Sequence, residues 1–152
     1  MANGEHLELV GRGVEAINAF TKEHEDVSLD LREADLSGMD LRNVRMQGAR
    51  LGGANLESCD LRGARLNSSD MRGCNLRNAD LRNANMHRAV LTGADLRGAQ
   101  LGRLGIGSQR MCISPATFED VNWDRDELER ILEMINLNPD WEVRYELVPR
   151  GE

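Results

Sequence analysis

The sequence predicts an all-β solenoid in which the chain winds around a narrow apolar axis. Three observations support this fold class. Five-residue units follow one another without insertion from 29 to 108, which gives 16 consecutive repeats. The third residue of the unit is Leu in 12 repeats, Met in three and Ile in one. Aromatic residues make up only 3% of the chain, so large rings do not build the core.

A period of five matches neither the 3.6 residues of an α-helix turn nor the two-residue period of a strand. If each unit is a short extended step, its first and third residues point inward and its second and fourth residues point outward. The first residue is Ala in nine repeats, which is small enough to lie beside the central Leu. The fifth residue is mostly Gly, Asn or Ser, and these residues suit a corner. Four steps and four corners close a square coil, so 16 repeats give about four coils of parallel, strand-like pairing.

Units such as Ala79-Asp80-Leu81 and Ala94-Asp95-Leu96 carry the motif A-(D/N)-L-x-x. The sequence therefore resembles the pentapeptide-repeat family over more than half of its length. This resemblance implies a right-handed quadrilateral parallel β-helix. It is specific for fold and says little about function, because one fold can host many functions.

The repeat divides the chain into an N-terminal region, the rod and a C-terminal region: 1–28, 29–108 and 109–152. Apolar residues from Leu7 to Phe20 recur at spacings of three and four. This spacing predicts one amphipathic helix, roughly from Glu8 to Lys22. A solenoid exposes its core at each end, so we expect this helix to cap the first coil.

After the last regular unit, Ala116–Trp123 resembles a degenerate repeat shifted by two residues. A helix is predicted from Asp124 to Asn136, and alternation predicts a strand over Trp141–Leu147. We interpret this region as a C-terminal cap, and the alternative is a homodimer interface built on that cap, because aromatic residues favour interfaces. The residues of this candidate interface are Leu128, Ile131, Leu132, Ile135, Trp141 and Tyr145.

The net charge of −7 is unevenly distributed along the chain. The repeat carries 12 Arg against nine acidic residues, whereas both flanking regions are acidic. Residues four repeats apart share a face of a square rod, and one face stacks Asp beside Arg. Opposite charges in adjacent columns offset the repulsion within each column. We interpret this face as a solvated ladder that fixes the register between coils. Its residues are Asp40, Asp60, Asp80, Arg42, Arg62 and Arg82.

The next face carries arginines and no acidic residue. A partner with an acidic surface could dock there, and the alternative is an uneven scatter of solvated arginines. The face has no aromatic residue on which bases could stack, which argues against direct nucleic-acid binding. The candidate partner-binding residues are Arg45, Arg65, Asn67, His87 and Arg88.

No arrangement typical of catalysis is found, so we predict a protein that is not an enzyme and has no cofactor or metal. The three histidines are far apart and none is paired with Cys or Asp at ligand spacing. Cys59 and Cys74 occupy first positions, where Ala is usual, and are predicted to be small buried residues. No glycine-rich phosphate-binding motif opens a helix.

The chain contains no run of 18 or more apolar residues and no charged-then-apolar leader. Its three cysteines are an odd number without metal-ligand spacing, which favours reduced thiols. We therefore expect a soluble cytoplasmic protein that makes no contact with a membrane.

Two functions from different classes are considered. The first is a non-catalytic scaffold that presents a rigid surface to an unidentified protein partner. The second comes from the family resemblance, because some members protect or inhibit DNA gyrase by mimicking DNA. Mimicry requires a rod covered with negative charge, since a duplex carries about one charge per 1.7 Å. The repeat here is net positive and no repeat centre is Phe, so we favour the scaffold.

Overall fold

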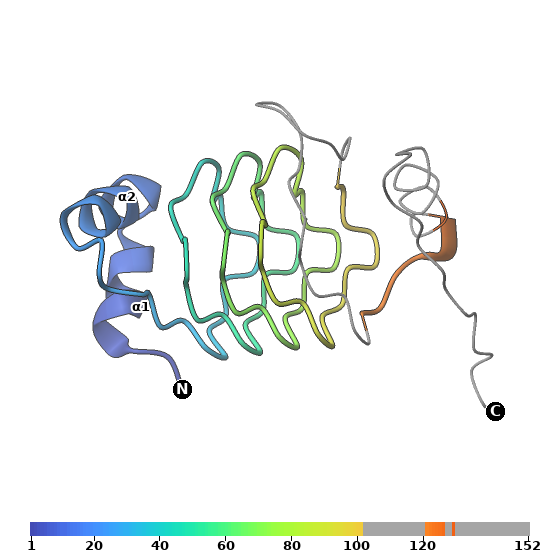
Figure 1. The fold of residues 1–152 in the computed structure, drawn as a ribbon, viewed down its shortest axis with the longest axis horizontal. Helices are drawn as coiled ribbons and strands as arrows, with labels where there is room; N and C mark the ends of the chain where they lie inside the picture. Colours follow the sequence, from blue (N-terminus) through green and yellow to red (C-terminus); the bar gives the residue numbers. More distant parts are fainter. Residues whose placement is uncertain (102–120, 127–128, 130–152) are drawn as a thin grey trace.

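The computed structural model describes residues 1–101, 121–126 and 129. Two helices, α1 (Gly4–Gly11) and α2 (Val14–Glu23), lie at one end of a stack of coils along which the chain advances (Figure 1). The coils are joined by isolated parallel β-bridges, because each straight step between corners is only a few residues long.

Bridges within the regular repeat join residues 20 positions apart, both at the second position of their units. Arg65, for example, bridges Arg45 on one side and Asn85 on the other. Its N–H donates to the carbonyl of Val44 (N···O 2.8 Å), and its own carbonyl accepts from Met46 (2.9 Å). The described coils are thus paired with their neighbours like parallel strands, and the predicted 20-residue coil is confirmed.

Apolar side chains fill the axis of the described rod. Third-position residues from Leu31 to Leu101 are at most 2% exposed, including the methionines that replace Leu. First-position residues from Ala49 to Ala99 are at most 5% exposed. The prediction of a central Leu or Met with a small residue beside it is therefore confirmed. Because the axis is filled, the outer surface is what the rod offers to other molecules.

The chain turns at the fifth residue of each unit. From Glu33 to Gly98, all 14 fifth-position residues have a positive φ between 57° and 73°. The N–H that follows donates to the third-position carbonyl, as in Ala54 to Leu51 at 2.8 Å, which closes a type II-like turn. Glycine adopts this conformation freely and asparagine tolerates it, which explains the composition of the corners. Arg88 adopts the same conformation with strain.

The N-terminal region forms two helices, so the prediction of one helix from Glu8 to Lys22 is wrong. The side chain of Asn3 caps α1 by accepting the N–H of Glu5 (2.9 Å). Gly13 has a φ of 91°, which an α-helix does not accommodate. This residue separates the two helices although the apolar spacing of the sequence continues across it.

Both helices contribute to the core at the end of the rod. Leu9, Val10 and Ile17 are buried in the same cluster as the repeat centres. Leu7, which the sequence pattern placed in the apolar stripe, is 39% exposed because the stripe does not continue as one face through the break. Neither helix in the described part of the chain is long and apolar enough to cross a membrane.

Polar side chains of the helical region complete hydrogen bonds of the first coil. In later coils the N–H of each second-position residue donates to a carbonyl of the preceding coil. Asp30 and Arg45 belong to the first coil, which has no preceding coil. The N–H of Asp30 donates to Nδ1 of His6 (2.9 Å), and the N–H of Arg45 donates to Oδ1 of Asn18 (2.7 Å). Nδ2 of Asn18 also donates to the carbonyl of Asn43 (3.2 Å). Two side chains thus stand in for part of a missing coil.

A segment near the C-terminus continues the stack out of register. Asn122 bridges Asp95, which is 27 residues earlier and not 20. A separation of 27 residues is five full repeats plus two residues. This agrees with the degenerate repeat, shifted by two residues, that the sequence suggests at Ala116–Trp123. The N–H of Leu96 donates to the carbonyl of Asn122 (2.9 Å), while Val121 and Trp123 pack against the core. Most of the predicted C-terminal helix and all of the predicted strand lie outside the described residues.

We expect Asn18→Ala to destabilise the first coil. The substitution removes the partner of the Arg45 N–H, which is half-buried, and of the exposed Asn43 carbonyl, and the loss of such a hydrogen bond costs about 0.5–1.5 kcal/mol. Urea denaturation should show a free energy of unfolding that is lower by about this amount. The control Glu15→Gln changes an exposed residue of the same helix and should stay within about 0.5 kcal/mol. Equal stability of the two variants would contradict the role of Asn18.

Candidate interaction surface

Most second-position side chains bond back to their own turn. In ten of the 14 complete repeats between 29 and 98, an Asp or Asn oxygen accepts the N–H of the fourth residue at 3.0–3.4 Å. These Asx-turns satisfy a main-chain donor that the coil ladder does not use. The sequence pattern predicted that the second residue faces outward from the rod, but it did not predict the hydrogen bond from the fourth-residue N–H to its side chain. The four exceptions have Arg45, Arg50, Arg65 or Val90 as second residue.

Six of these Asp residues also bind the arginine two positions later through both carboxylate oxygens. In each pair Nε lies 2.8 Å from Oδ1, and Nη2 lies 2.5–2.7 Å from Oδ2. Between coils, Nε of Arg42 lies 3.6 Å from Asp60, and Nε of Arg62 lies 3.6 Å from Asp80. The predicted Asp–Arg ladder is confirmed, and these arginines contact acids in two successive coils.

The arginines lower the pKa of the paired carboxyl groups. The side-chain hydrogen bond from Arg42 is the largest cause that lowers the pKa of Asp40 from 3.8 to about 2. Arg32 has the same effect on Asp30, whose pKa is also about 2. The carboxylates are therefore charged at neutral pH, and each has a positive charge beside it.

A different arrangement is present on the face that we call the arginine face. It consists of the repeats 44–48, 64–68 and 84–88. Arg45 and Arg65 lie one coil apart, since a β-bridge joins them. The carbonyls of Asn67 and His87 each accept a hydrogen bond from the preceding coil, at 2.9 and 2.8 Å. Arg88 follows at the corner with a φ of 60°. The structure therefore places all five candidate partner-binding residues on neighbouring coils of one face.

Among the residues that the structure describes, the arginines of this face differ from the others in that no acidic side chain pairs with them. The stretch 29–101 contains 11 arginines, and eight of them form an ion pair with an Asp at 2.5–3.8 Å. No ion pair within the described part of the chain involves Arg45, Arg65 or Arg88. Arg65 and Arg88 are exposed, whereas Arg45 is half-buried. Its Nε atom is buried and has no acceptor among the described residues.

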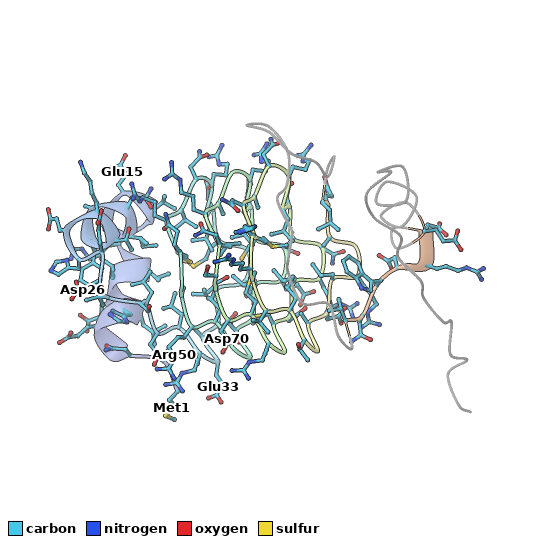
Figure 2. All side chains as sticks on the ribbon, viewed as in Figure 1. Met1, Glu15, Asp26, Glu33, Arg50 and Asp70 are labelled. Carbon is cyan, nitrogen blue, oxygen red and sulfur yellow. The ribbon has the colours of Figure 1, made fainter. Side chains whose placement is uncertain are left out.

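The neighbouring face, formed by the repeats that follow those of the arginine face, has compensated charges. Figure 2 shows Met1, Glu33, Arg50 and Asp70 along one side of the rod. The amino group of Met1 lies 3.4 Å from the Glu33 carboxylate, and Nη1 of Arg50 lies 3.7 Å from Asp30. The arginine face therefore differs from this neighbouring face, because none of its arginines forms an ion pair with an acidic residue of the described part of the chain.

The described residues offer neither a reactive thiol nor a metal centre. Cys59 and Cys74 are buried, and their thiols donate to the carbonyls of Leu36 (2.9 Å) and Leu51 (3.0 Å). Burial raises the pKa of Cys59 and raises the pKa of Cys74 to about 12, so both thiols stay protonated near neutral pH. No group of three or more His, Cys, Asp or Glu side chains in this part of the chain could hold a metal ion.

The candidate interface of the C-terminal region lies outside the described residues. It comprises Leu128, Ile131, Leu132, Ile135, Trp141 and Tyr145. Dimerisation through this region therefore stays a prediction from the sequence.

The parallel bridges, the filled axis and the corners with positive φ define a repeat protein of the β-helix type of solenoid. The family model for pentapeptide repeats matches this chain with eight copies, over residues 29–57 and 59–98. The chain belongs to the pentapeptide-repeat family, as the resemblance in its sequence predicted. Membership of this family implies that the solenoid is right-handed.

Solved structures of other pentapeptide-repeat proteins are similar to this chain. One from the cyanobacterium Cyanothece is 30% identical, with a TM-score of 0.45, and the match covers 61% of this chain and 55% of that protein. One from the thylakoid lumen of Arabidopsis thaliana is 30% identical, with a TM-score of 0.33, over 69% of this chain and 75% of that one. QnrB1, a plasmid-mediated fluoroquinolone resistance protein, is 17% identical over 68% of each chain, with a TM-score of 0.24. No curated protein sequence matches this chain significantly.

We expect the stability of the rod to decline below about pH 4, and Asp40→Asn to make this decline shallower. The pKa of Asp40 is lowered from its ordinary 3.8 to about 2 in the folded protein. Its bond with Arg42 therefore stabilises the fold above about pH 4 and is lost as the pH falls toward 2. Asn keeps the oxygen of the Asx-turn, as Asn75 does, but does not titrate. Denaturant unfolding between about pH 2 and pH 7 measures both profiles, and profiles of equal slope would contradict this assignment.

Proposed function

We propose that this protein is a non-catalytic scaffold that presents a rigid surface to an acidic protein partner. The observation that carries the proposal is that the three arginines without an acidic partner in the described rod, Arg45, Arg65 and Arg88, all lie on the arginine face. A non-catalytic role is supported by the packed axis, because apolar side chains occupy the space in which a ligand pocket would otherwise form.

Stacked arginines are unfavourable without an anion beside them. Arg45 and Arg65 are bridged partners in adjacent coils, which lie about 4.8 Å apart in a parallel sheet. Like charges directly opposite each other destabilise a sheet. On the other faces Asp residues offset this repulsion, and on the arginine face the carboxylates of a partner would do so. Charge complementarity of this kind mainly speeds association and selects the partner.

The conformation of Arg88 supports a role at the surface. Its φ of 60° is one that Gly adopts without strain, whereas a residue with a long side chain is strained by about 1–3 kcal/mol. The exposed side chain adds nothing to the core that would offset this strain. Contact of the Arg88 guanidinium group with another molecule would explain why a strained arginine occupies this corner of the arginine face.

We also infer that the rod has about four coils and is capped at both ends. An N-terminal cap is supported by His6 and Asn18, which replace bonds to a missing coil, and by the complete burial of Ile17. A C-terminal cap is supported by Trp123, which packs against the core. The two unpaired thiols of the described rod favour a reducing compartment such as the cytoplasm.

Modulation of DNA gyrase is the alternative that the family resemblance raises. A DNA mimic needs an extended surface of negative charge. In the described rod, six Asp carboxylates are each bonded to an Arg of the same repeat, so much of the negative charge is neutralised locally. A supercoiling assay separates the two functions. Inhibition or protection of gyrase at low micromolar protein would contradict a scaffold that acts only through the arginine face.

Charge reversal on the arginine face should abolish partner binding while the rod stays folded. We expect the double variant Arg65→Glu, Arg88→Glu to lose the proteins that the wild-type chain captures from a native lysate, as quantified by mass spectrometry. The double variant Arg12→Glu, Lys22→Glu makes the same change in net charge at exposed residues of the helical region and should capture them normally. Circular dichroism checks the fold of both. Equal capture by the two variants would show that the arginine face is only solvated.

A further inference from the structure

Two main-chain N–H groups on the arginine face lack the acceptor that the rod normally provides. In ten repeats, a second-position Asp or Asn oxygen accepts the N–H of the fourth residue. Where the second residue is Arg45 or Arg65, the fourth residues Gln47 and Asn67 have no such oxygen. No other acceptor among the described residues binds these two N–H groups. Both residues are only half-buried, so another molecule can approach them.

The same two repeats also hold guanidinium groups that form no ion pair with any described residue. Two further repeats between 29 and 98 lack the Asx oxygen, those of Arg50 and Val90. Arg50 is paired with Asp30 at 3.7 Å, and Val90 brings no charge. Within the described rod, the combination of an unpaired cation and an unsatisfied N–H two residues later is therefore confined to the arginine face. In the first of its repeats, Nε of Arg45 is a further buried donor that has no acceptor in the described part of the chain.

The rod itself shows which anion suits these donors. One carboxylate oxygen of Asp60 accepts the N–H of Arg62 at 3.2 Å and its Nε at 2.8 Å, and the other oxygen accepts Nη2 at 2.6 Å. An N–H group and a guanidinium thus share one planar carboxylate. In the next repeat the N–H of Asn67 and the guanidinium of Arg65 are both present, but that repeat has no carboxylate of its own.

We propose that the arginine face binds side-chain carboxylates of an acidic protein segment, with one carboxylate in each of the Arg45 and Arg65 repeats. Each carboxylate accepts the N–H of Gln47 or Asn67 and pairs with the guanidinium of its repeat. The inference rests on the proposed function and names the chemistry of the partner. Hydrogen bonds in which one group is ionised are roughly twice as strong as neutral ones, which makes such a pair of sites selective for carboxylates that arrive together.

The distance between the two repeats favours an acidic helix over an acidic strand. Adjacent coils lie about 4.8 Å apart. Residues three or four apart on a helix have their Cβ atoms about 5–6 Å apart, whereas alternate residues on one side of a strand are about 6.6 Å apart. A helix with Glu at positions i and i+4 therefore matches the arginine face more closely.

Amide NMR measures the proposed bonds directly. The probe is an alanine-based helical peptide with Glu at i and i+4, titrated into the full 15N-labelled chain. We expect the amide protons of Gln47 and Asn67 to shift downfield and reach saturation. The amides of Arg42 and Arg62 already donate to Asp and should shift little. A peptide of equal composition with Glu at i and i+2 presents its carboxylates on different sides and should bind more weakly.

A single substitution can supply the missing acceptor from within the chain. In Arg65→Asn, the new amide oxygen should accept the N–H of Asn67, as Asn75 does for the fourth residue of its repeat. We expect peptide binding to weaken by about tenfold, since a charge-assisted bond is lost, while the melting temperature does not fall. Arg50→Asn makes the same change at the same repeat position on the neighbouring face and should bind the peptide like wild type.

Three results would overturn the proposal. The first is the absence of shifts at Gln47 and Asn67 at a peptide concentration that saturates the other signals. If capture from the lysate still depends on Arg65 and Arg88, the proposed function survives that result. The second is wild-type affinity of Arg65→Asn for the peptide. The third is tighter binding of a DNA duplex of equal charge, which would assign the arginine face to nucleic acid.

Discussion

The rod turns only where a fifth residue adopts a positive φ, and this requirement organises the other four positions. Because each corner has the same geometry, the third residue always points to the axis and the second always faces outward. The turn also directs the fourth N–H toward the second side chain, which is why Asp and Asn are useful there. Glu33, Ser58 and Arg88 also adopt this conformation although it is strained for them, so the pairing between coils imposes the turn even on residues that disfavour it.

The same turn decides which charges remain available to another molecule. An Asp at the second position accepts the N–H of the fourth residue and also pairs with the guanidinium of an Arg at that position. The carboxylate, the guanidinium and the N–H group are then all satisfied within one repeat, as at Asp60 and Arg62. At Arg65, a second-position arginine, neither the guanidinium nor the N–H of Asn67 has an anion among the described residues, whereas the second-position Arg50 pairs with Asp30. A change of residue type at the second position thus leaves donors that the Asp-containing repeats satisfy within themselves, and the proposal is that a partner satisfies them. The proposed binding site is therefore defined by polar groups that have no partner among the described residues, more than by the shape of the rod.

The fold could be predicted from the sequence because equivalent residues of the repeat have equivalent surroundings. If the Leu at the third position of one repeat is buried, the third-position residues of the other repeats are expected to be buried as well. The face that carries Arg65 and Arg88 could be predicted for the same reason, since the coil length alone assigns residues to faces. The break between the two N-terminal helices was harder to predict, because the spacing of apolar residues does not show whether one residue adopts a positive φ. Gly13 was the one available signal for the break. The state of the Asn67 N–H was beyond sequence reasoning, because it depends on the direction of the main chain within the turn.

Both ends of a hydrogen-bonded stack and any irregular repeat within it pose the same physical problem. At the first coil the problem is solved in part inside the chain, where His6 and Asn18 bind two of the N–H groups that a preceding coil would have bound. On the arginine face the described chain provides no such side chain for Gln47 and Asn67. Since a solenoid satisfies its main-chain groups through stacking, donors without acceptors gather where stacking or the Asx pattern stops. Under the proposed function, a partner recognises the departures from the repeat, while the regular repeat holds those donors in place.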